Sequence, residues 1–316
     1  MAKAGGVALA VLASAAFGSS GSFASSLLDN CWSPVAVVAL RVGIAALVLL
    51  GPALYAVRGR WHLVTRNLRS ISLFGLVGVA ACQVMYFEAV ARLSVGIALL
   101  LEYLGVLLIV LWQWLARHVR PGRLTIAGTG LALVGLALVL GVFSRMQLDV
   151  VGVLWGLGAA VALAGYFFIS SDSDEELPAV TMSGLSMGLG AVILAVIGGL
   201  GLVPLHGNTR DVVLARHTVS WVVPILGIAL IAAALAYVLG IAAARALGAK
   251  LSSFVSLTEV LFAVVFAWAL LGQRPTWLEA FGGVLIIAGV ALVRVEELRR
   301  PDAPASAPEP LATLVA

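Results

Sequence analysis

Ten stretches of about twenty apolar residues run almost end to end through this chain and constrain its fold more than any other feature. Each stretch is long enough for a helix that crosses the ~30 Å hydrocarbon layer of a bilayer. Only 11% of the residues are charged, against about 25% in a typical soluble domain, so a soluble fold of this length could not cover its surface. We therefore expect an all-α membrane protein with ten transmembrane helices, at roughly 5–27, 34–57, 71–91, 94–115, 122–142, 151–171, 181–204, 219–243, 250–271 and 276–294.

The basic residues between the stretches predict the orientation of the chain. If the N-terminus is cytoplasmic, thirteen Arg and Lys residues fall in cytoplasmic segments and five in outer ones. The positive-inside rule then predicts both termini in the cytoplasm of a bacterial-type cell, with the chain in the inner membrane. The acidic run 172–176 falls on the cytoplasmic side as well, which the rule tolerates because acidic residues contribute little. We interpret the net charge of +4 as this orientation signal and expect no nucleic-acid partner.

The two halves of the chain resemble each other. The segment 120–139 (RPGRLTIAGTGLALVGLALV) matches the segment 274–293 (RPTWLEAFGGVLIIAGVALV), which aligns Gly128 with Gly282 and Gly135 with Gly289. Because each half contains an odd number of spans, the second half must be inverted relative to the first, a design typical of secondary transporters. The prediction is two inverted five-helix repeats, 1–147 and 148–295, followed by a Pro/Ala-rich cytoplasmic tail, 296–316, that is disordered.

Two glutamates lie near the middle of predicted spans. Glu102 is in the fourth span and Glu259 in the ninth, where a carboxylate costs about 2.5–3.5 kcal/mol even on the most lenient scale. In the repeat alignment, Glu102 matches Ser256 and Glu259 matches Gly105, so each glutamate lies one helical turn from the other's equivalent position, on the same helix face. We expect both to reach one central cavity and there to take up protons or bind a substrate ammonium. The alternative is that each one permanently bonds neighbouring hydroxyls or caps a broken helix.

Other polar residues inside the spans are weaker candidates for the lining of that cavity. They are Ser20, Gln83, Tyr86, Tyr103, Tyr237 and Ser256. The alternative for the hydroxyl groups is a bond back to a helix carbonyl. Arg41, in the second span, is a candidate partner for a substrate carboxylate or an internal glutamate, although its side chain could equally extend to the outer interface. The two cysteines, Cys31 and Cys82, are expected to be small apolar fillers.

The sequence carries no pattern typical of an enzyme. The four histidines lie in loops or at span edges, without a His-Glu-x-x-His motif or a paired-cysteine ligand set. No phosphate-binding loop with the Gly-Lys-Ser/Thr order is present, which excludes an ATP-driven pump within this chain. We therefore expect a protein that is not an enzyme and needs no metal or other cofactor.

Four segments, taken in order, resemble the motifs of one transporter family. AFGSSGSF (16–23) looks like a first-helix Trp-Gly-Ser-Ser motif with Phe17 in the aromatic place, and SPVAVVALRVGIAALVLL (33–50) is similar to a second-helix Pro-to-Arg pattern. LSVGIALLLEYLGVL (93–107) and SFVSLTEVLFAVVFAWALLGQRPT (253–276) are similar to the glutamate-containing fourth and ninth helices. Together they resemble the EamA-type ten-helix proteins of the drug/metabolite transporter superfamily, with the fourth helix closest to the threonine/homoserine exporter branch.

This resemblance implies a function. It implies a secondary transporter that exports small metabolites, such as amino acids or related compounds, by alternating access, driven by proton exchange or running downhill. The alternative is an uncoupled exporter or a channel for another class of solute, such as drugs, nucleosides or aromatic compounds. The expected partners are a small-molecule substrate, the lipid bilayer and protons. The sequence leaves open whether the protein is a monomer or a homodimer.

Overall fold

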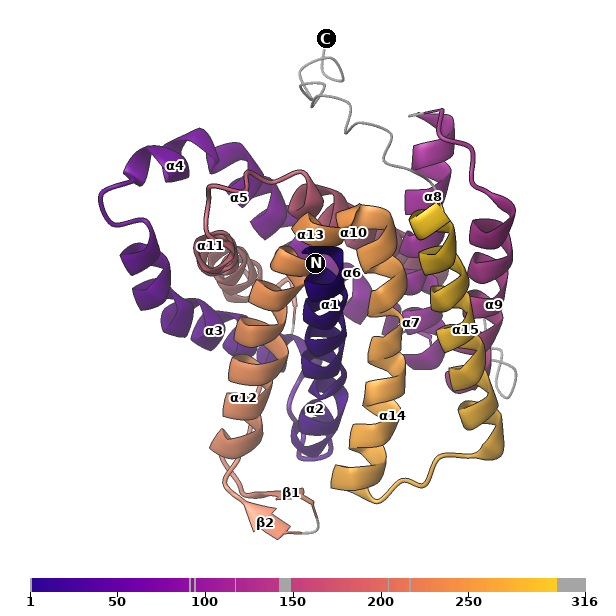
Figure 1. Cartoon of the computed structure of the whole chain (residues 1–316). Helices are drawn as coiled ribbons and strands as arrows, with labels where there is room; N and C mark the ends of the chain where they lie inside the picture. Colours follow the sequence, from indigo (N-terminus) through magenta and orange to yellow (C-terminus); the bar gives the residue numbers. More distant parts are fainter. Residues whose placement is uncertain are drawn as a thin grey trace.

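The computed structural model describes residues 2–90, 92–93, 95–116, 118–141, 149–203, 205–215 and 217–299, and most of these residues are helical (Figure 1). The helices of the first half are α1 (Ala2–Gly18), α2 (Ser20–Leu28), α3 (Pro34–Ala56), α4 (Trp61–Arg66), α5 (Leu68–Leu73), the π-helix η1 (Phe74–Ala81), α6 (Cys82–Val90), α7 (Val95–Tyr103), α8 (Gly105–Leu115) and α9 (Arg123–Val139). The elements of the second half are α10 (Val150–Ser171), α11 (Ala179–Gly199), β1 (Val212–Leu214), β2 (His217–Val219), α12 (Val222–Ala229), the π-helix η3 (Leu230–Leu235), α13 (Ala236–Ser256), α14 (Thr258–Leu271) and α15 (Trp277–Arg299).

The helices begin and end at residues suited to those places. Ser33 caps α3 by accepting a hydrogen bond from the amide of Ala36, and Pro34 takes the first helical position. Asp149 caps α10 in the same way through the amide of Gly152, at 2.7 Å. At the other end of a helix, Gly272 adopts the left-handed conformation that terminates α14. These local signals place the helix boundaries close to the limits of the apolar stretches.

The described residues form the ten predicted spans. Eight helical stretches are long and apolar enough to cross a membrane, and Arg123–Val139 and Thr258–Leu271 are shorter apolar helices. The longest stretch, Val222–Ser256, contains Gly248 with φ 76° and ψ 164°, a conformation that no α-helix accommodates. The chain therefore turns at Gly248, and the ninth span runs from there through α14. The predicted all-α membrane fold with ten helices is confirmed.

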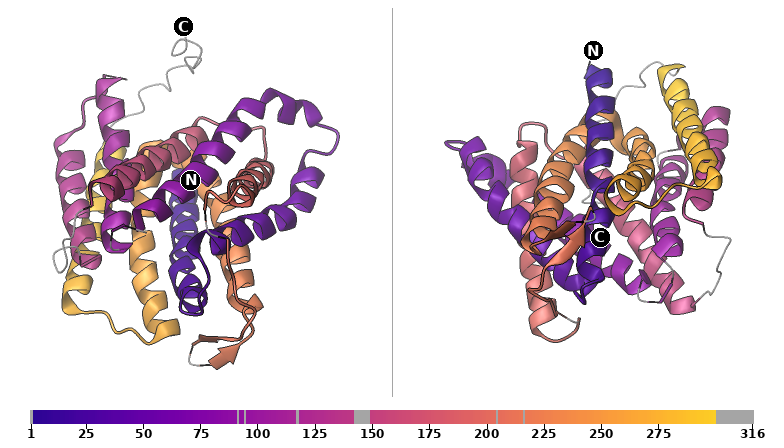
Figure 2. Two further views of the ribbon diagram at one scale, coloured as in Figure 1. Left: turned by 180° about the vertical axis from the view of Figure 1, so that it is seen from behind. Right: turned by 90° about the horizontal axis from the view of Figure 1, so that it is seen from below.

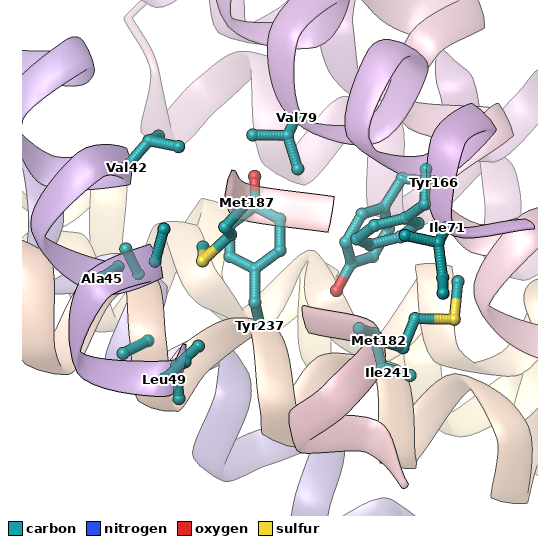
Figure 3. Close-up of a cluster of buried hydrophobic side chains, with 14 of the residues drawn as sticks. Val42, Ala45, Leu49, Ile71, Val79, Tyr166, Met182, Met187, Tyr237 and Ile241 are labelled. Carbon is teal, nitrogen blue, oxygen red and sulfur yellow. The ribbon is translucent and has the colours of Figure 1, made fainter. Parts of the chain in front are cut away.

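The outer surface and the interior both fit a membrane-spanning bundle. Large apolar side chains such as Leu47 and Val150 are 72% and 73% exposed, as expected of a surface covered by lipid. Inside, a cluster of buried side chains joins the two halves (Figure 3). Its labelled members come from α3, α5 and η1 of the first half and from α10, α11 and α13 of the second: Val42, Ala45, Leu49, Ile71, Val79, Tyr166, Met182, Met187, Tyr237 and Ile241.

The contact between α9 and α15 has the symmetry that the sequence match predicts. The two helices stand side by side at one edge of the bundle (Figures 1 and 2). A Cβ atom on Gly128 would lie 2.7 Å from the carbonyl oxygen of Gly289, and Gly135 meets Gly282 in the same way. The sequence alignment matches Gly128 with Gly282 and Gly135 with Gly289. It therefore maps each of these two contacts onto the other. Only glycine permits so close an approach of the two backbones.

Two features differ from the sequence prediction. The helix α15 continues to Arg299, so residues 296–299, expected to belong to the tail, are helical, and residues 300–316 lie outside the described part. The reason is long-range: the carboxylate of Glu296 accepts hydrogen bonds from the amides of Gly122 and Thr125, at the start of α9. The connection between the seventh and eighth spans also contains the antiparallel hairpin β1–β2, which was not predicted.

Candidate functional site

A cavity of about 450 Å³ lies between the two halves of the bundle. Its volume is in the range of pockets that hold small organic ligands. All nine residues proposed from the sequence lie on its wall, whatever their roles: Ser20, Arg41, Gln83, Tyr86, Glu102, Tyr103, Tyr237, Ser256 and Glu259. The polar residues that were proposed because they lie inside apolar spans therefore come from six different spans and line one common cavity. That these residues bind a substrate remains a prediction.

The two glutamates line this cavity from the fourth and the ninth span, each beside an interruption of its helix. Glu102 lies just before Leu104, where α7 gives way to α8, and Glu259 lies just after Leu257, where α13 gives way to α14. The thiol of Cys82 donates a hydrogen bond to Oε1 of Glu102 at 3.3 Å. Glu259 interacts with the hydroxyl of Tyr103, and the two carboxyl groups interact electrostatically with each other. Both side chains are half-buried, so they face the cavity without being sealed from it.

Arg41 supplies positive charge to the same space. Its side chain is only 7% exposed, and its two terminal nitrogens donate to Oγ of Ser20 at 3.1 Å and to the carbonyl of Ala232 at 3.3 Å. The alternative that Arg41 extends to the outer interface is therefore wrong. Ala232 lies in the π-helix η3, whose wider turn leaves carbonyl groups free to accept bonds from outside the helix. Arg41 interacts with both glutamates electrostatically, and its short contacts hold it in place.

Aromatic rings form the side of the cavity nearest the buried core. The ring centroid of Tyr237 lies 5.2 Å from that of Phe17 and 5.7 Å from that of Tyr166. The hydroxyl of Tyr237 donates to the carbonyl of Gly78 at 3.4 Å. By contrast, Ser256 bonds back to the carbonyl of Ser253 at 2.7 Å, which is the alternative that the sequence left open for such hydroxyls.

The lining residues that the sequence did not propose as site candidates include Phe17, Cys82 and Tyr166. Cys82 was expected to be a filler, and that expectation is wrong because its thiol bonds a carboxyl group inside the cavity. Cys82 directly precedes Gln83, a proposed lining residue of the same span, and this position could have indicated that Cys82 lines the cavity. Tyr166 is a tyrosine in the interior of an apolar span, which was a similar but weaker signal.

The cavity is open at one end and closed at the other. At the end on the side of β1–β2, which we call the hairpin end, the lining residue Leu28 is 39% exposed and Ser25 and Pro34 are half-buried. At the opposite end, the lining residues Ala10 and Ser252 are 5% and 3% exposed. Among the described lining residues, those at the hairpin end are therefore more exposed than those at the opposite end, which indicates a state that opens toward the hairpin end.

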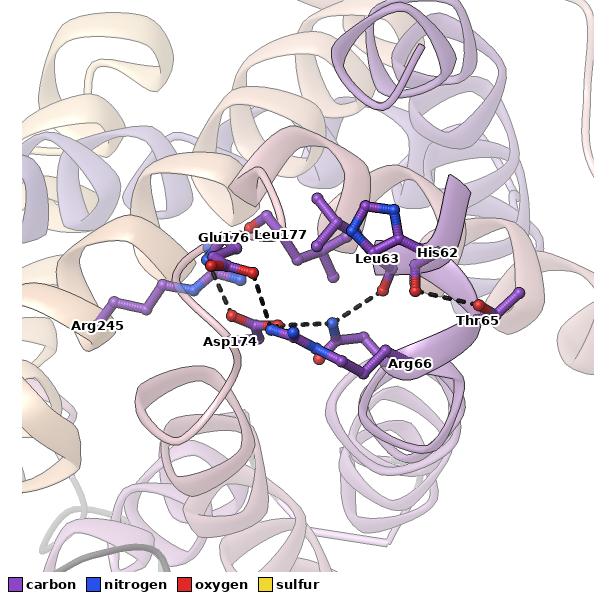
Figure 4. Close-up of polar contacts among 9 residues, drawn as sticks. His62, Leu63, Thr65, Arg66, Asp174, Glu176, Leu177 and Arg245 are labelled. Atoms are coloured by element: carbon purple, nitrogen blue, oxygen red, sulfur yellow. Dashed lines mark hydrogen bonds and ion pairs between the residues drawn. The ribbon is translucent and has the colours of Figure 1, made fainter. Parts of the chain in front are cut away.

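A group of polar and charged side chains ties the two halves together on the closed side (Figure 4). This charged cluster comprises Arg66 and Asn67 from the first half and Ser173, Asp174, Glu176 and Arg245 from the second. Asp174 pairs with Arg66 and accepts a hydrogen bond from Asn67 at 3.0 Å. Arg245 donates to Ser173 at 2.8 Å and to the carbonyl of Leu177 at 2.6 Å. Acidic side chains of the run 172–176 thus form ion pairs with Arg66. We call this side of the molecule the acidic-loop end.

The pKa values in the charged cluster reflect these contacts. Desolvation by burial raises the pKa of Asp174, but hydrogen bonds from Asn67 and Arg66 outweigh it, and the pKa of Asp174 is below its usual value. The hydrogen bond and charge of Asp174 in turn raise the pKa of Arg66 above its usual value. Both groups therefore stay charged at neutral pH, so their attraction is available to hold the two halves together under those conditions.

The fold and the site together define a class: a polytopic membrane protein of two inverted halves around a charged, one-sided cavity. Comparison with known proteins agrees. Residues 4–141 and 150–295 each match the EamA-like transporter family, and the chain belongs to that family. Its members are transporters.

Relatives and a solved structure extend the comparison. The chain is 25% identical to the uncharacterized inner membrane transporter YicL of Salmonella typhimurium, over 73% of this chain and 74% of that protein. It is 24% identical to the uncharacterized transporter YwfM of Bacillus subtilis, over 94% and 97% of the two chains. A crystal structure superposes with a TM-score of 0.73 over 94% of this chain and 98% of its own, at 19% identity, which shows the shared fold. The matched relatives carry no substrate in their names, so the exporter branch stays a prediction.

Proposed function

We propose that this protein is a secondary transporter that exports small zwitterionic metabolites, such as amino acids, across the inner membrane by alternating access. The observation that carries the proposal is the cavity itself, which holds Glu102, Glu259 and Arg41 between the two halves and whose described lining is more exposed at the hairpin end than at the opposite end. A substrate ammonium would be held by the glutamates, and a substrate carboxylate would be attracted to Arg41. An enclosed site with one open end supports a carrier over a continuously open channel.

We propose further that protons take part in transport. Two carboxyl groups share a low-dielectric space with one guanidinium, so the group of three carries an excess negative charge when both carboxyl groups are ionised. A proton or a substrate ammonium can compensate that excess, and competition between the two would couple their movements. With the orientation predicted from the basic residues, the hairpin end faces outward and both termini are cytoplasmic.

The test is solute flux in proteoliposomes that contain the purified protein. A panel of labelled L-amino acids is measured with and without an imposed pH gradient, after a thermal-shift screen has selected the compounds that stabilise the protein. We expect saturable flux, and a loss on the order of ten- to a hundredfold in Glu102→Gln and Glu259→Gln, as for the removal of a charged hydrogen bond. Glu175→Gln, an exposed glutamate in the acidic loop, is the matched control and should transport like the wild type.

The outcomes separate the possible mechanisms. Saturable flux that a pH gradient does not change supports an uncoupled carrier and shows that protons do not take part in transport. Flux that does not saturate indicates a channel. No flux of any amino acid, together with no effect of Glu102→Gln on any compound that binds, would contradict the proposal.

A further inference from the structure

A second cavity, of about 180 Å³, adjoins the central one. Four residues line both of them: Leu99, Tyr103, Glu259 and Ala263. Glu259 and Tyr103 therefore lie at the junction of the two spaces. We call the smaller space the side cavity.

The rest of the side cavity is apolar. Beyond the four shared residues its lining is Val139, Leu140, Val260, Val264 and Ala267. These side chains come from α9, from Leu140 directly after it and from α14, and Leu99 and Tyr103 come from α7. The helix α9 packs mainly on α15 and only touches α7 and α14, which leaves the space between the three helices unfilled.

The size of the side cavity indicates what it could hold. In another protein, an apolar cavity of about 150 Å³ stays dry and binds benzene. At about 180 Å³, the side cavity has room for an apolar group of that size. A group of that kind would leave water on entering, and each buried methylene strengthens binding about fourfold. A ligand in the side cavity would also have a carboxyl group, Glu259, directly at its polar end.

We propose that the side cavity binds the apolar tail of an amphiphilic substrate whose ammonium group is held at Glu259, with a tail of up to about six carbons. This inference rests on the proposed function, because it places the substrate at Glu259, and it narrows the substrate to amines that carry an alkyl or ring-sized apolar group. Residue Ala267 belongs to the side cavity alone, so it determines the length of tail that fits without touching the charged groups.

A homologous series of alkylammonium salts tests the inference. Binding of ethyl-, butyl-, hexyl- and octylammonium chloride to the full-length protein in detergent is measured by titration calorimetry. We expect affinity to rise about fourfold for each methylene, on the order of a hundredfold from ethyl to hexyl, and to level off by octyl. Ala267→Leu fills part of the side cavity and should remove most of that rise while leaving ethylammonium unchanged. Val264→Phe is a second variant that should do the same.

The matched control is Ala269→Leu, the same substitution on an exposed face of the same helix. Uptake of the tail into detergent is equal for all these proteins, so it cancels in the comparison. A rise that is lost in Ala267→Leu and Val264→Phe but kept in Ala269→Leu supports the proposal. The same rise in all four proteins would overturn it, because the tail would then bind elsewhere.

Two further outcomes would also overturn it. Affinity that does not depend on tail length, with a lipid that co-purifies with the wild type and is absent from Ala267→Leu, means that the side cavity holds a lipid acyl chain instead. If no alkylammonium binds, the inference fails, whereas amino-acid flux that depends on Glu102 and Glu259 would leave the proposed function standing. The failure of one can therefore be distinguished from the failure of the other.

Discussion

The two ends of the central cavity are held by different kinds of contact. At the acidic-loop end, charged side chains from both halves pair across the gap, with Asp174 between Arg66 and Asn67. At the hairpin end, the contacts are neutral: Trp32 donates to the carbonyl of Asn208 at 2.7 Å, and Asn30 donates to the carbonyl of Arg210 at 3.1 Å.

This difference shows how a fold with two similar halves can favour one open end. The neutral contacts at the hairpin end join the α2–α3 connection to residues 206–210 through hydrogen bonds to backbone carbonyls. The charged cluster spans the closed side and fixes the α10–α11 connection against α4 and α13. Because these charged contacts link the two halves on this side, we expect single substitutions there to change which end is open.

Arg245→Ala should have the largest effect. It removes the hydrogen bonds to Ser173, to the carbonyl of Leu177 and to the sulfur of Met182, which should lower the free energy of unfolding by about 2–3 kcal/mol. Arg245→Lys keeps the charge but not the forked geometry of the guanidinium group, so its free energy of unfolding should lie between those of the wild type and Arg245→Ala. Thermal unfolding in detergent measures this, with the exposed Arg58→Ala as control. An unchanged melting temperature for Arg245→Ala would mean that the charged cluster does not stabilise this state.

Asp174→Asn should shift the balance between the two ends. Its carboxylate accepts from Arg66 and Asn67, and the loss of the charge should favour opening of the acidic-loop end by about 1.5 kcal/mol, roughly tenfold. The readout is the rate at which a membrane-impermeant maleimide labels Ser252→Cys from the acidic-loop side, in a chain without Cys31 and Cys82. Glu175→Gln serves as the control. Equal labelling rates with and without the Asp174→Asn substitution would show that another contact closes this end.

The pH dependence of the closed end follows from the lowered pKa of Asp174. A carboxyl group with a lowered pKa stabilises the folded contact above its usual pKa of 3.8, and that contribution is lost as the pH falls through the lower value. The rate of Ser252→Cys labelling, corrected for reagent chemistry, should therefore stay constant from about pH 8 to pH 5. A rise in the rate within that range that disappears in Asp174→Asn would contradict this assignment.

At the hairpin end, Trp32→Phe should have the smallest effect. It removes the hydrogen bond to Asn208 but keeps an aromatic ring against Trp221, at an expected cost of about 0.5–1.5 kcal/mol. The melting temperature should fall slightly, and labelling of Ser252→Cys from the acidic-loop side should not change. A change in that labelling would show that the two ends are coupled through Trp32.

Much of the fold could be predicted because lipid imposes strong constraints. Apolar length fixed the spans, and the cost of a carboxylate in hydrocarbon singled out Glu102 and Glu259, both of which line the cavity. The glycines matched between 120–139 and 274–293 predicted a repeat, and the structure adds that they meet each other.

The remaining features depend on partners that are distant in the sequence. Whether Cys82 fills space or bonds Glu102 depends on how the third and fourth spans face each other, which periodicity does not report. The extension of α15 to Arg299 depends on Glu296 meeting the start of α9. The charged cluster likewise requires the acidic run to find Arg66, and hydropathy treats both as loops.

The central claim is that one cavity between the halves is reached from one end at a time. Sided labelling of Ser256→Cys, which lies on the cavity wall, tests it most directly in a chain without Cys31 and Cys82. An impermeant maleimide should react from the hairpin side of the membrane, and Asp174→Asn should add reaction from the acidic-loop side. Equal reaction from both sides without that substitution, or none from either side, would contradict the account.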